Sequence, residues 1–284
     1  MPMLPYKQVD VFTAVPYLGN PLGVILDGEG LSTEQMHRVT EWTNLSECTF
    51  VLRPTTQEAD YRVRIFCPGR ELPFAGHPTL GSCHAWLEAG GVSKQAGVVV
   101  QECGAGLVPI RVEQESGCLA FEAPARNRSG PLEEAEVELI ASGLGIARSE
   151  ILAHSWCDNG PGWMAVLLES AEQVLAVRPD PQLLGDLDIG VVGAHTAPVA
   201  GEPQFELRAF FPGNSGLTED PVTGSLNAAV AQWLIGDGIA PSHYLAAQGT
   251  AIGRKGRIHI SSTGDKVWVG GHSVTCIDGS MRRP

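Results

Sequence analysis

Two stretches half a chain apart decide the fold: VRIFCPG at residues 63–69 and LRAFFPG at residues 207–213. A shift of 144 residues matches them, with Arg64 on Arg208 and a closing Phe-x-Pro-Gly in both. Each stretch alternates in the manner of a half-buried strand and is followed by a loop and an apolar helical segment. A strand, a loop and a helix that recur together predict an internal duplication.

The helical segments after the two stretches begin where an anion could bind. They read HPTLGSCHAWLEAG at residues 77–90 and PVTGSLNAAVAQWLIGDG at residues 221–238. The first is expected to be helical from about Thr79, and the unbroken shift pairs Gly76 with Asp220. The first amide groups of a helix lack intrahelical partners and bind anions well. We therefore expect two helix starts, one from each repeat, to face each other in a cleft that suits a small carboxylate.

The length and composition agree with two halves. The chain has 284 residues, 43% of them hydrophobic, which is enough apolar material for one or two cores. We expect an N-terminal half over residues 1–125 and a C-terminal half over residues 126–265. A final strand and tail over residues 266–284 follow, with a return of that strand to the N-terminal half as one option.

Charge and cysteine content exclude several classes of protein. Lys and Arg total 19 against 32 Asp and Glu, a formal net charge of −13, with no local cluster of basic residues. Such a chain repels nucleic-acid backbones. No apolar run approaches the roughly 20 residues of a membrane span, the N-terminus lacks a signal-peptide pattern, and the seven cysteines form no CxxC pair. We expect a soluble, cytoplasmic protein with reduced thiols that binds neither nucleic acid nor membrane.

Common catalytic and cofactor motifs are absent from the sequence. There is no GxxxxGK[ST] phosphate loop, no GxSxG, no HExxH and no dinucleotide-binding fingerprint. His77 and His84 lie seven residues apart, but no cysteine or carboxylate cluster joins them as metal ligands. The pattern favours a hydrogen-bonding role for His84 and predicts no metal site.

Glu47 lies at a junction between two expected elements. Ser32 and Gln35 form a capping-box pattern at the start of a helix that ends near Asn44, and CTFVL at residues 48–52 begins a strand. A side chain at such a junction can project from the edge of a rigid element. An exposed surface glutamate fits the same pattern, so the residues alone leave the role of Glu47 open.

Two further polar residues have both a functional and a structural interpretation. His77 in AGHPT could bind a ligand or hydrogen-bond to the backbone of its loop. Asp220 in EDPVTGS could bind a ligand or cap the helix that follows. Composition does not decide between these interpretations.

Six segments together resemble the motifs of the PhzF-like isomerase family of phenazine biosynthesis. In chain order they are VDVFTAVPYLGNPLGVIL, TNLSE, FAGHPTLG, EDPVTGS, QGTAIGRKGRI and VWVGG, and they extend from residue 9 to residue 271. The pair FAGHPTLG and EDPVTGS is quite specific. The family is similar in fold to diaminopimelate epimerase, an α+β fold of two duplicated halves, each a curved mixed or antiparallel sheet wrapped around a central helix. The repeat fits that architecture independently.

The resemblance implies a role for each candidate residue. Glu47 is implied as the general acid/base that relocates a proton on the substrate. His77 and Asp220 are implied as polar groups that contact the substrate. Three residues at the helix starts are implied to bind the substrate carboxylate: Gly76, Gly224 and Ser225.

The resemblance also implies a small carboxylate metabolite as substrate, no metal, no cofactor and a homodimer. The related epimerases use two opposed cysteines, where this chain has Gly76 and Asp220, so racemisation by two thiols is not expected. The leading expectation is a cofactor-independent isomerase that moves a proton or double bond. The alternatives are an amino-acid epimerase or racemase with a second base, a non-catalytic protein that binds small acids, and an interaction scaffold.

Overall fold

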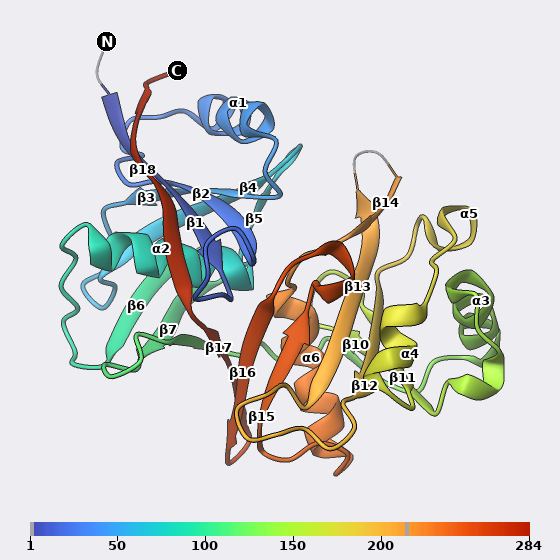
Figure 1. The fold of residues 1–284 in the computed structure, drawn as a ribbon. Helices are drawn as coiled ribbons and strands as arrows, with labels where there is room; N and C mark the ends of the chain where they lie inside the picture. The colour runs from blue at the N-terminus through green and yellow to red at the C-terminus, as the bar shows by residue number, and fades with distance from the viewer. Residues whose placement is uncertain (1–2, 214–215) are drawn as a thin grey trace. The chain divides into compact units, whose positions relative to one another are not determined.

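Two compact units make up the computed structural model, which describes residues 3–213 and 216–284 (Figure 1). Unit 1 comprises Met1–Glu122 together with Gly270–Pro284, and unit 2 comprises Ala123–Val269. The sequence places the divisions after residues 125 and 265, within three or four residues of those in the structure. The last strand of the chain belongs to unit 1.

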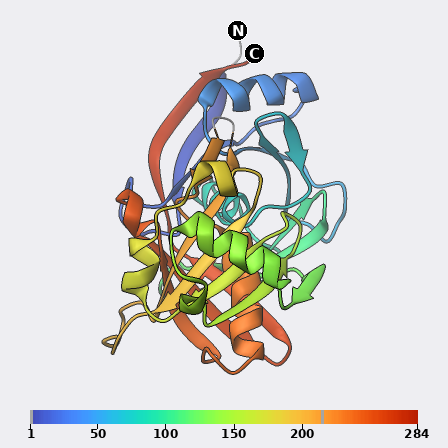
Figure 2. The same cartoon turned by 90° about the vertical axis from the view of Figure 1, so that its right-hand side faces the viewer.

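Unit 1 is a curved mixed sheet around one central helix, α2. Its elements are β1 (Met3–Val11), β2 (Asn20–Ile25), α1 (Thr33–Thr43), β3 (Cys48–Leu52), β4 (Tyr61–Cys67), β5 (Arg70–Leu72), α2 (Gly76–Glu88), β6 (Val98–Cys103), β7 (Gly106–Val112), β8 (Leu119–Glu122) and β18 (Ser273–Arg282). β2 pairs in parallel with β3, as β4 does with β6. α2 contacts β1, β2, β3, β6, β8 and β18, and Figure 2 shows it nearly end-on among these strands. The helix is buried along most of its length, as its small and apolar residues predict.

Unit 2 has a mixed sheet with its longest helix, α6, on one face and shorter helices on the other. Its helices are α3 (Glu134–Leu144), α4 (Ala171–Ala176), α5 (Pro181–Leu184) and α6 (Gly224–Gly236), with 3-10 turns at Arg148–Glu150 and Thr250–Ile252. Its strands are β9 (Arg128–Gly130), β10 (Ala153–Asp158), β11 (Met164–Leu168), β12 (Ile189–Ala194), β13 (Phe205–Gly213), β14 (Gly216–Glu219), β15 (His243–Gln248), β16 (Gly256–Thr263) and β17 (Lys266–Gly271). Side chains of β12 alternate between the two faces: Gly190 lies against Leu226 of α6, whereas Ile189 and Val191 join the apolar cluster with α3 and α4.

An identical ion pair in the two units reveals the duplication. In unit 1, Arg64 Nε and Nη2 lie 2.7 and 2.6 Å from the two carboxylate oxygens of Glu71. In unit 2, Arg208 Nε and Nη2 lie 2.9 and 2.7 Å from those of Glu219. Each arginine belongs to the repeated strand and each glutamate to the strand that follows it. The internal repeat predicted from the sequence is thus present in the fold.

The shift of 144 residues matches the two repeated strands but no longer matches the residues after the hairpins that follow them. The repeated phenylalanine lies opposite the ion-pair glutamate in both units, but the hairpin of unit 2 contains four more residues. Beyond the hairpin the two units therefore match with a shift of 148 residues. Gly76 and Gly224 are the first residues of α2 and α6. The predicted match of Gly76 with Asp220 is wrong, because Asp220 precedes the helix.

α2 begins at Gly76, three residues before the predicted start at Thr79. Pro78 lies in the first turn, where a proline is tolerated because the backbone N–H at that point would have no intrahelical partner. The earlier start places both Gly76 and His77 in the first turn of the central helix.

Candidate active site

Glu47 follows α1 and immediately precedes β3, as the sequence predicts. α1 has the predicted capping box of Ser32 and Gln35, and Asn44 ends it in a left-handed conformation with φ 56°. The Glu47 carbonyl accepts a hydrogen bond from the Gly23 N–H at 3.5 Å, which ties the residue to β2. The side chain of Glu47 is only 18% exposed. It is therefore not the freely exposed surface glutamate that the sequence left open.

His77 contacts Glu47 from the first turn of α2. Its Nε2 lies 3.3 Å from Glu47 Oε2, and the imidazole is almost completely buried. On the other side of the ring, His77 Nδ1 lies 3.4 Å from the side-chain nitrogen of Asn20, a fully buried residue at the start of β2. The structure thus brings together two of the predicted site residues and adds a third residue, Asn20.

The protonation of His77 follows from its surroundings. Burial lowers the pKa of His77 from its ordinary value to about 3, so the ring is neutral near neutral pH. An amide nitrogen can only donate, and so Asn20 Nδ2 donates to Nδ1 and the single ring proton is assigned to Nε2. Nε2–H then faces the Glu47 carboxylate, with Oε2 at 3.3 Å.

A buried glutamine in each unit holds the start of the central helix. Gln248 Oε1 accepts from the Thr223 N–H at 3.0 Å, and Gln248 Nε2 donates to Thr223 Oγ1 at 2.9 Å and to the Asp220 carbonyl at 3.1 Å. In unit 1, Gln101 Nε2 donates to Thr79 Oγ1 at 3.0 Å. Both glutamines are fully buried. Buried amides with satisfied hydrogen bonds fix the first turn of each helix in place.

Asp220 lies in the segment that leads from β14 to α6. Thr223 is the N-cap residue of α6, and its hydroxyl donates to Asp220 Oδ2 at 2.5 Å. The Asp220 N–H donates to the Ala209 carbonyl at 3.0 Å. Asp220 is therefore not the cap of the helix but a half-buried carboxylate positioned just before it.

Ser225 is held in the first turn of α6 by two side chains from the loop before β11. Trp163 Nε1 donates to Ser225 Oγ at 3.0 Å, and Asn159 Nδ2 donates to the Ser225 carbonyl at 2.9 Å. Gly224 is buried beside it. The residues that the resemblance assigns to carboxylate binding, Gly76, Gly224 and Ser225, all lie in the first turn of a central helix.

Sequence reasoning missed the residues that hold these groups. Asn20 and Gln248 lie 57 and 25 residues from the partners His77 and Thr223, and Trp163 lies 62 residues from Ser225. Asn20 and Gln248 are buried polar residues at the ends of largely apolar strands. That pattern was the available signal, because a buried amide needs hydrogen-bond partners.

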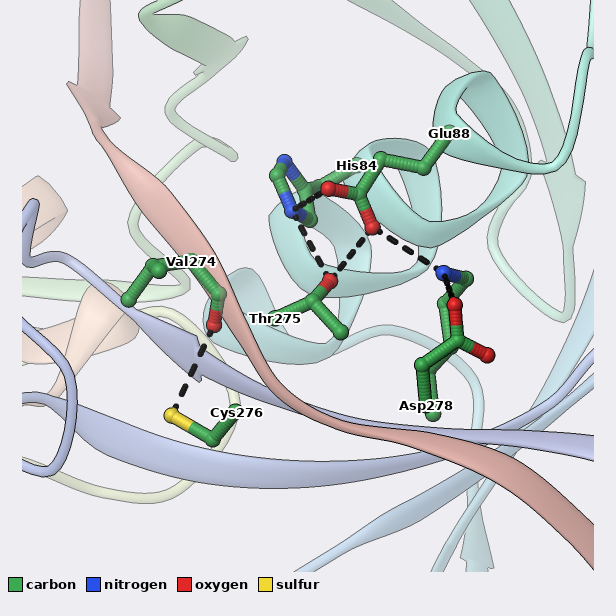
Figure 3. Close-up of polar contacts among 7 residues, drawn as sticks. His84, Glu88, Val274, Thr275, Cys276 and Asp278 are labelled. Carbon is green, nitrogen blue, oxygen red and sulfur yellow. Dashed lines mark hydrogen bonds and ion pairs between the residues drawn. The ribbon is translucent and has the colours of Figure 1, made fainter.

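His84 belongs to a separate network where α2 contacts β18 (Figure 3). Its Nε2 lies 3.3 Å from Glu88 Oε1 and 3.2 Å from Thr275 Oγ1, and Lys7 Nζ lies 2.7 Å from Asp278 Oδ2. His84 thus has the hydrogen-bonding role that the sequence favours. Among residues 3–213 and 216–284, no group of three or more His, Cys, Asp or Glu is placed to hold a metal ion. The helices described for this chain include none that is both long and apolar enough to cross a membrane.

The duplicated α+β architecture, with a curved mixed sheet around a central helix, is an epimerase-like fold. The family model "PhzC-PhzF: Phenazine biosynthesis-like protein" matches residues 9–279. The chain belongs to this PhzC-PhzF family. The resemblance drawn from the six sequence segments is confirmed.

Similar proteins extend over nearly the whole chain. Antisense-enhancing sequence 1 of Schizosaccharomyces pombe is 35% identical over 96% of this chain and 97% of its own. The trans-2,3-dihydro-3-hydroxyanthranilate isomerase of Pseudomonas aeruginosa is 35% identical over 91% of this chain and 90% of its own. A crystal structure of a PhzF-family protein from Enterococcus faecalis is 23% identical, with a TM-score of 0.81 over 99% of this chain and 100% of its own. The diaminopimelate epimerase-like fold is confirmed, and the chain is an enzyme of the isomerase class.

Proposed function

We propose that the chain isomerises a small carboxylate metabolite by moving a proton, with Glu47 as the general acid/base. The observation that supports this most is the contact of 3.3 Å between Glu47 Oε2 and His77 Nε2. It puts a neutral imidazole beside a largely buried carboxylate, and carboxylates held in such surroundings are effective in proton transfer. The Pseudomonas aeruginosa relative is named for trans-2,3-dihydro-3-hydroxyanthranilate, and we take this compound as the first substrate to test.

In the proposed reaction Glu47 first acts as a base. It takes a proton from a carbon of the substrate, and the electron pair of the broken C–H bond moves into the adjoining double-bond system. The protonated Glu47 then returns the proton to a different carbon, so that substrate and product contain the same atoms. His77 keeps Glu47 in place and does not compete with it, because burial lowers the pKa of the imidazole to about 3.

Each unit offers a helix start of its own at which a substrate carboxylate is proposed to bind. Gly76, Gly224 and Ser225 lie in first turns, where backbone N–H groups lack intrahelical partners and the helix dipole favours an anion. His77 and Asp220 are proposed as further substrate contacts. The homodimer expected from the resemblance stays a prediction.

The proposed role of Glu47 is tested by isomerisation in deuterated buffer. We expect the wild-type enzyme to convert at least one carboxylate metabolite of a panel, beginning with trans-2,3-dihydro-3-hydroxyanthranilate, and to incorporate solvent deuterium. Glu47→Gln keeps the shape of the side chain but cannot accept the proton, and we expect turnover to fall by about 10²-fold or more. Substrate affinity and melting temperature are expected to change little. Glu41→Gln, an exposed glutamate on α1, is the matched control and is expected to behave as the wild type.

Three outcomes would contradict the proposal. Near-wild-type turnover of Glu47→Gln would show that Glu47 is not the general acid/base. Binding across the panel without any exchange would favour a non-catalytic acid-binding protein. Deuterium incorporated at a stereocentre with inversion, but with no shift of a double bond, would favour an epimerase.

A further inference from the structure

Asp188 occupies in unit 2 the position that Glu47 occupies in unit 1. Glu47 is the residue before β3, and Asp188 is the residue before β12. The first residue of each of these strands lies opposite the repeated phenylalanine, Phe66 in unit 1 and Phe210 in unit 2. The antiparallel register therefore assigns the two acidic residues to equivalent positions of the duplicated fold.

The parallel pairing on the other side of each strand gives the same assignment. The Glu47 carbonyl accepts from the Gly23 N–H of β2 at 3.5 Å, and the Asp188 carbonyl accepts from the Met164 N–H of β11 at 2.9 Å. In unit 1 the donor Gly23 pairs with Cys48, the first residue of β3. In unit 2 the donor Met164 pairs with Ile189, the first residue of β12. The strands on both sides therefore assign Asp188 to the position in unit 2 that Glu47 occupies in unit 1.

Strand alternation directs Asp188 to the face of the sheet that α6 covers. Gly190 lies two residues further along β12 and packs against Leu226, in the first turn of α6. Residues two apart in a strand point to the same face, so the Asp188 side chain lies on that face beside the first turn. Ser225, proposed above to bind the substrate, is the neighbour of Leu226 in this turn. Asp188 is only partly exposed.

The loop beside Asp188 contributes a second acceptor. The Asn159 side-chain nitrogen donates to the Ser225 carbonyl, which fixes the orientation of the amide, and the buried Asn159 Oδ1 has no hydrogen-bond partner among the described residues. The loop is held by Asp158, whose Oδ1 accepts from the N–H groups of Gly160 and Gly162 at 2.7 and 3.0 Å. A buried amide oxygen that lacks a donor is costly, and a ligand N–H or O–H would supply one.

We propose that Asp188 is a specificity-determining residue that accepts a hydrogen bond from an amino or hydroxyl group of the substrate, with Asn159 Oδ1 as a second acceptor. The start of α6 supplies donors for a carboxylate, whereas Asp188 and Asn159 supply acceptors. The substrate class is therefore a carboxylic acid that carries an N–H or O–H donor. This inference rests on the proposed function, since it assumes a carboxylate substrate at the start of α6.

The test measures equilibrium binding and needs no turnover. Calorimetry compares anthranilate and salicylate with benzoate, from which they differ by one amino or one hydroxyl group. For the wild-type protein we expect tighter binding of the two acids that carry a donor. Asp188→Asn removes the charged acceptor at nearly constant volume, and we expect it to reduce this preference by about 10- to 100-fold. Benzoate affinity and melting temperature are expected to stay constant. Asp186→Asn removes an exposed carboxylate two residues away and is the matched control.

Several results would overturn the assignment. A wild-type protein with no preference for either donor-bearing acid would exclude an acceptor site for the substrate. An unchanged preference in Asp188→Asn would exclude Asp188 from it. An equal loss of affinity for all three acids, together with a lower melting temperature, would show that Asp188 is structural. Because Glu47→Gln reports on turnover and Asp188→Asn on binding preference, failure of one proposal is distinguishable from failure of the other.

Discussion

His77 is a buried histidine whose protonation state can be observed directly. Asn20 Nδ2 faces one ring nitrogen and Glu47 Oε2 the other, and burial lowers the His77 pKa to about 3. We therefore expect a neutral ring protonated on Nε2 from neutral pH down to about pH 4. Nitrogen-15 NMR distinguishes protonated from unprotonated ring nitrogens. A proton on Nδ1, or a cationic ring near neutral pH, would contradict the assignment.

The same lowered pKa makes His77 a source of acid sensitivity. Between the ordinary pKa of 6.5 and the folded pKa of about 3, the unfolded chain binds a proton at this residue that the folded chain does not. The free energy of unfolding therefore falls as the pH falls through this window, by about 1.4 kcal/mol per pH unit from this group. Denaturant titrations of His77→Gln over this window should show a flatter pH dependence than those of the wild-type protein.

At the residue scale, sequence reasoning found the groups proposed for chemistry but not those that position them. The junction that holds Glu47 was predictable from a capping box and an apolar strand that lie close together in the chain. Asn20 was not, because its contact with His77 joins residues 57 apart. The only indication of Asn20 in the sequence is that it is a polar residue in a largely apolar strand. Long-range hydrogen bonds leave no periodic pattern, and so the support of a site is harder to predict than its reactive groups.

At the element scale, the repeated strand was predictable and the length of its hairpin was not. A strand is recognised from its alternation, which an added turn does not disturb. The four additional residues in the hairpin of unit 2 move the match of the helices from 144 to 148 residues, so that Gly76 matches Gly224. The unbroken alignment carried no information about this insertion.

The duplicated ion pair offers a matched comparison of burial within one molecule. The side chains of Arg208 and Glu219 are 7% and 12% exposed, whereas those of Arg64 and Glu71 are 26% and 38% exposed. Removal of one partner from a buried pair leaves an uncompensated charge, and we expect Glu219→Gln to destabilise unit 2 by about 3 kcal/mol. Glu71→Gln should cost unit 1 no more than about 1 kcal/mol, because water solvates the remaining arginine.

Hydrogen exchange followed by mass spectrometry measures this comparison, since it reports on the opening of each unit separately. Glu219→Gln should accelerate exchange in β13 and α6 and leave β4 and α2 unchanged. Equal effects of the two substitutions would contradict the prediction, because they would mean that burial does not govern the strength of the pair. Arg208→Lys should have an intermediate effect on exchange in unit 2, since it keeps the positive charge but loses the bidentate hydrogen bonding to Glu219.

At the scale of the whole molecule, the two units differ in how the chain builds them. Unit 2 is one continuous segment, whereas unit 1 needs both ends of the chain. The sequence left open whether the final strand returns to the first half, because the alternation of apolar and polar residues does not show which strand it pairs with. In the structure β18 pairs antiparallel with β1 from Met3–Arg282 to Val11–Ser273. Unit 1 can therefore be completed only when the last residues are available.

This difference predicts unequal effects of removing the end of the chain. Deletion of residues 273–284 takes away the strand beside β1, together with Asp278, which pairs with the buried Lys7 at 2.7 Å. β1 would keep β2 as its neighbour but would become an edge strand with unpaired backbone groups. We expect amide exchange in β1 and α2 to accelerate by at least about 10-fold while α6 in unit 2 keeps its protection. Thr275→Val, which keeps β18 and removes the hydroxyl contacts to Glu88 and His84, is the control and should have a small effect. Unchanged exchange in β1 after the deletion would mean that unit 1 does not depend on the strand that closes it.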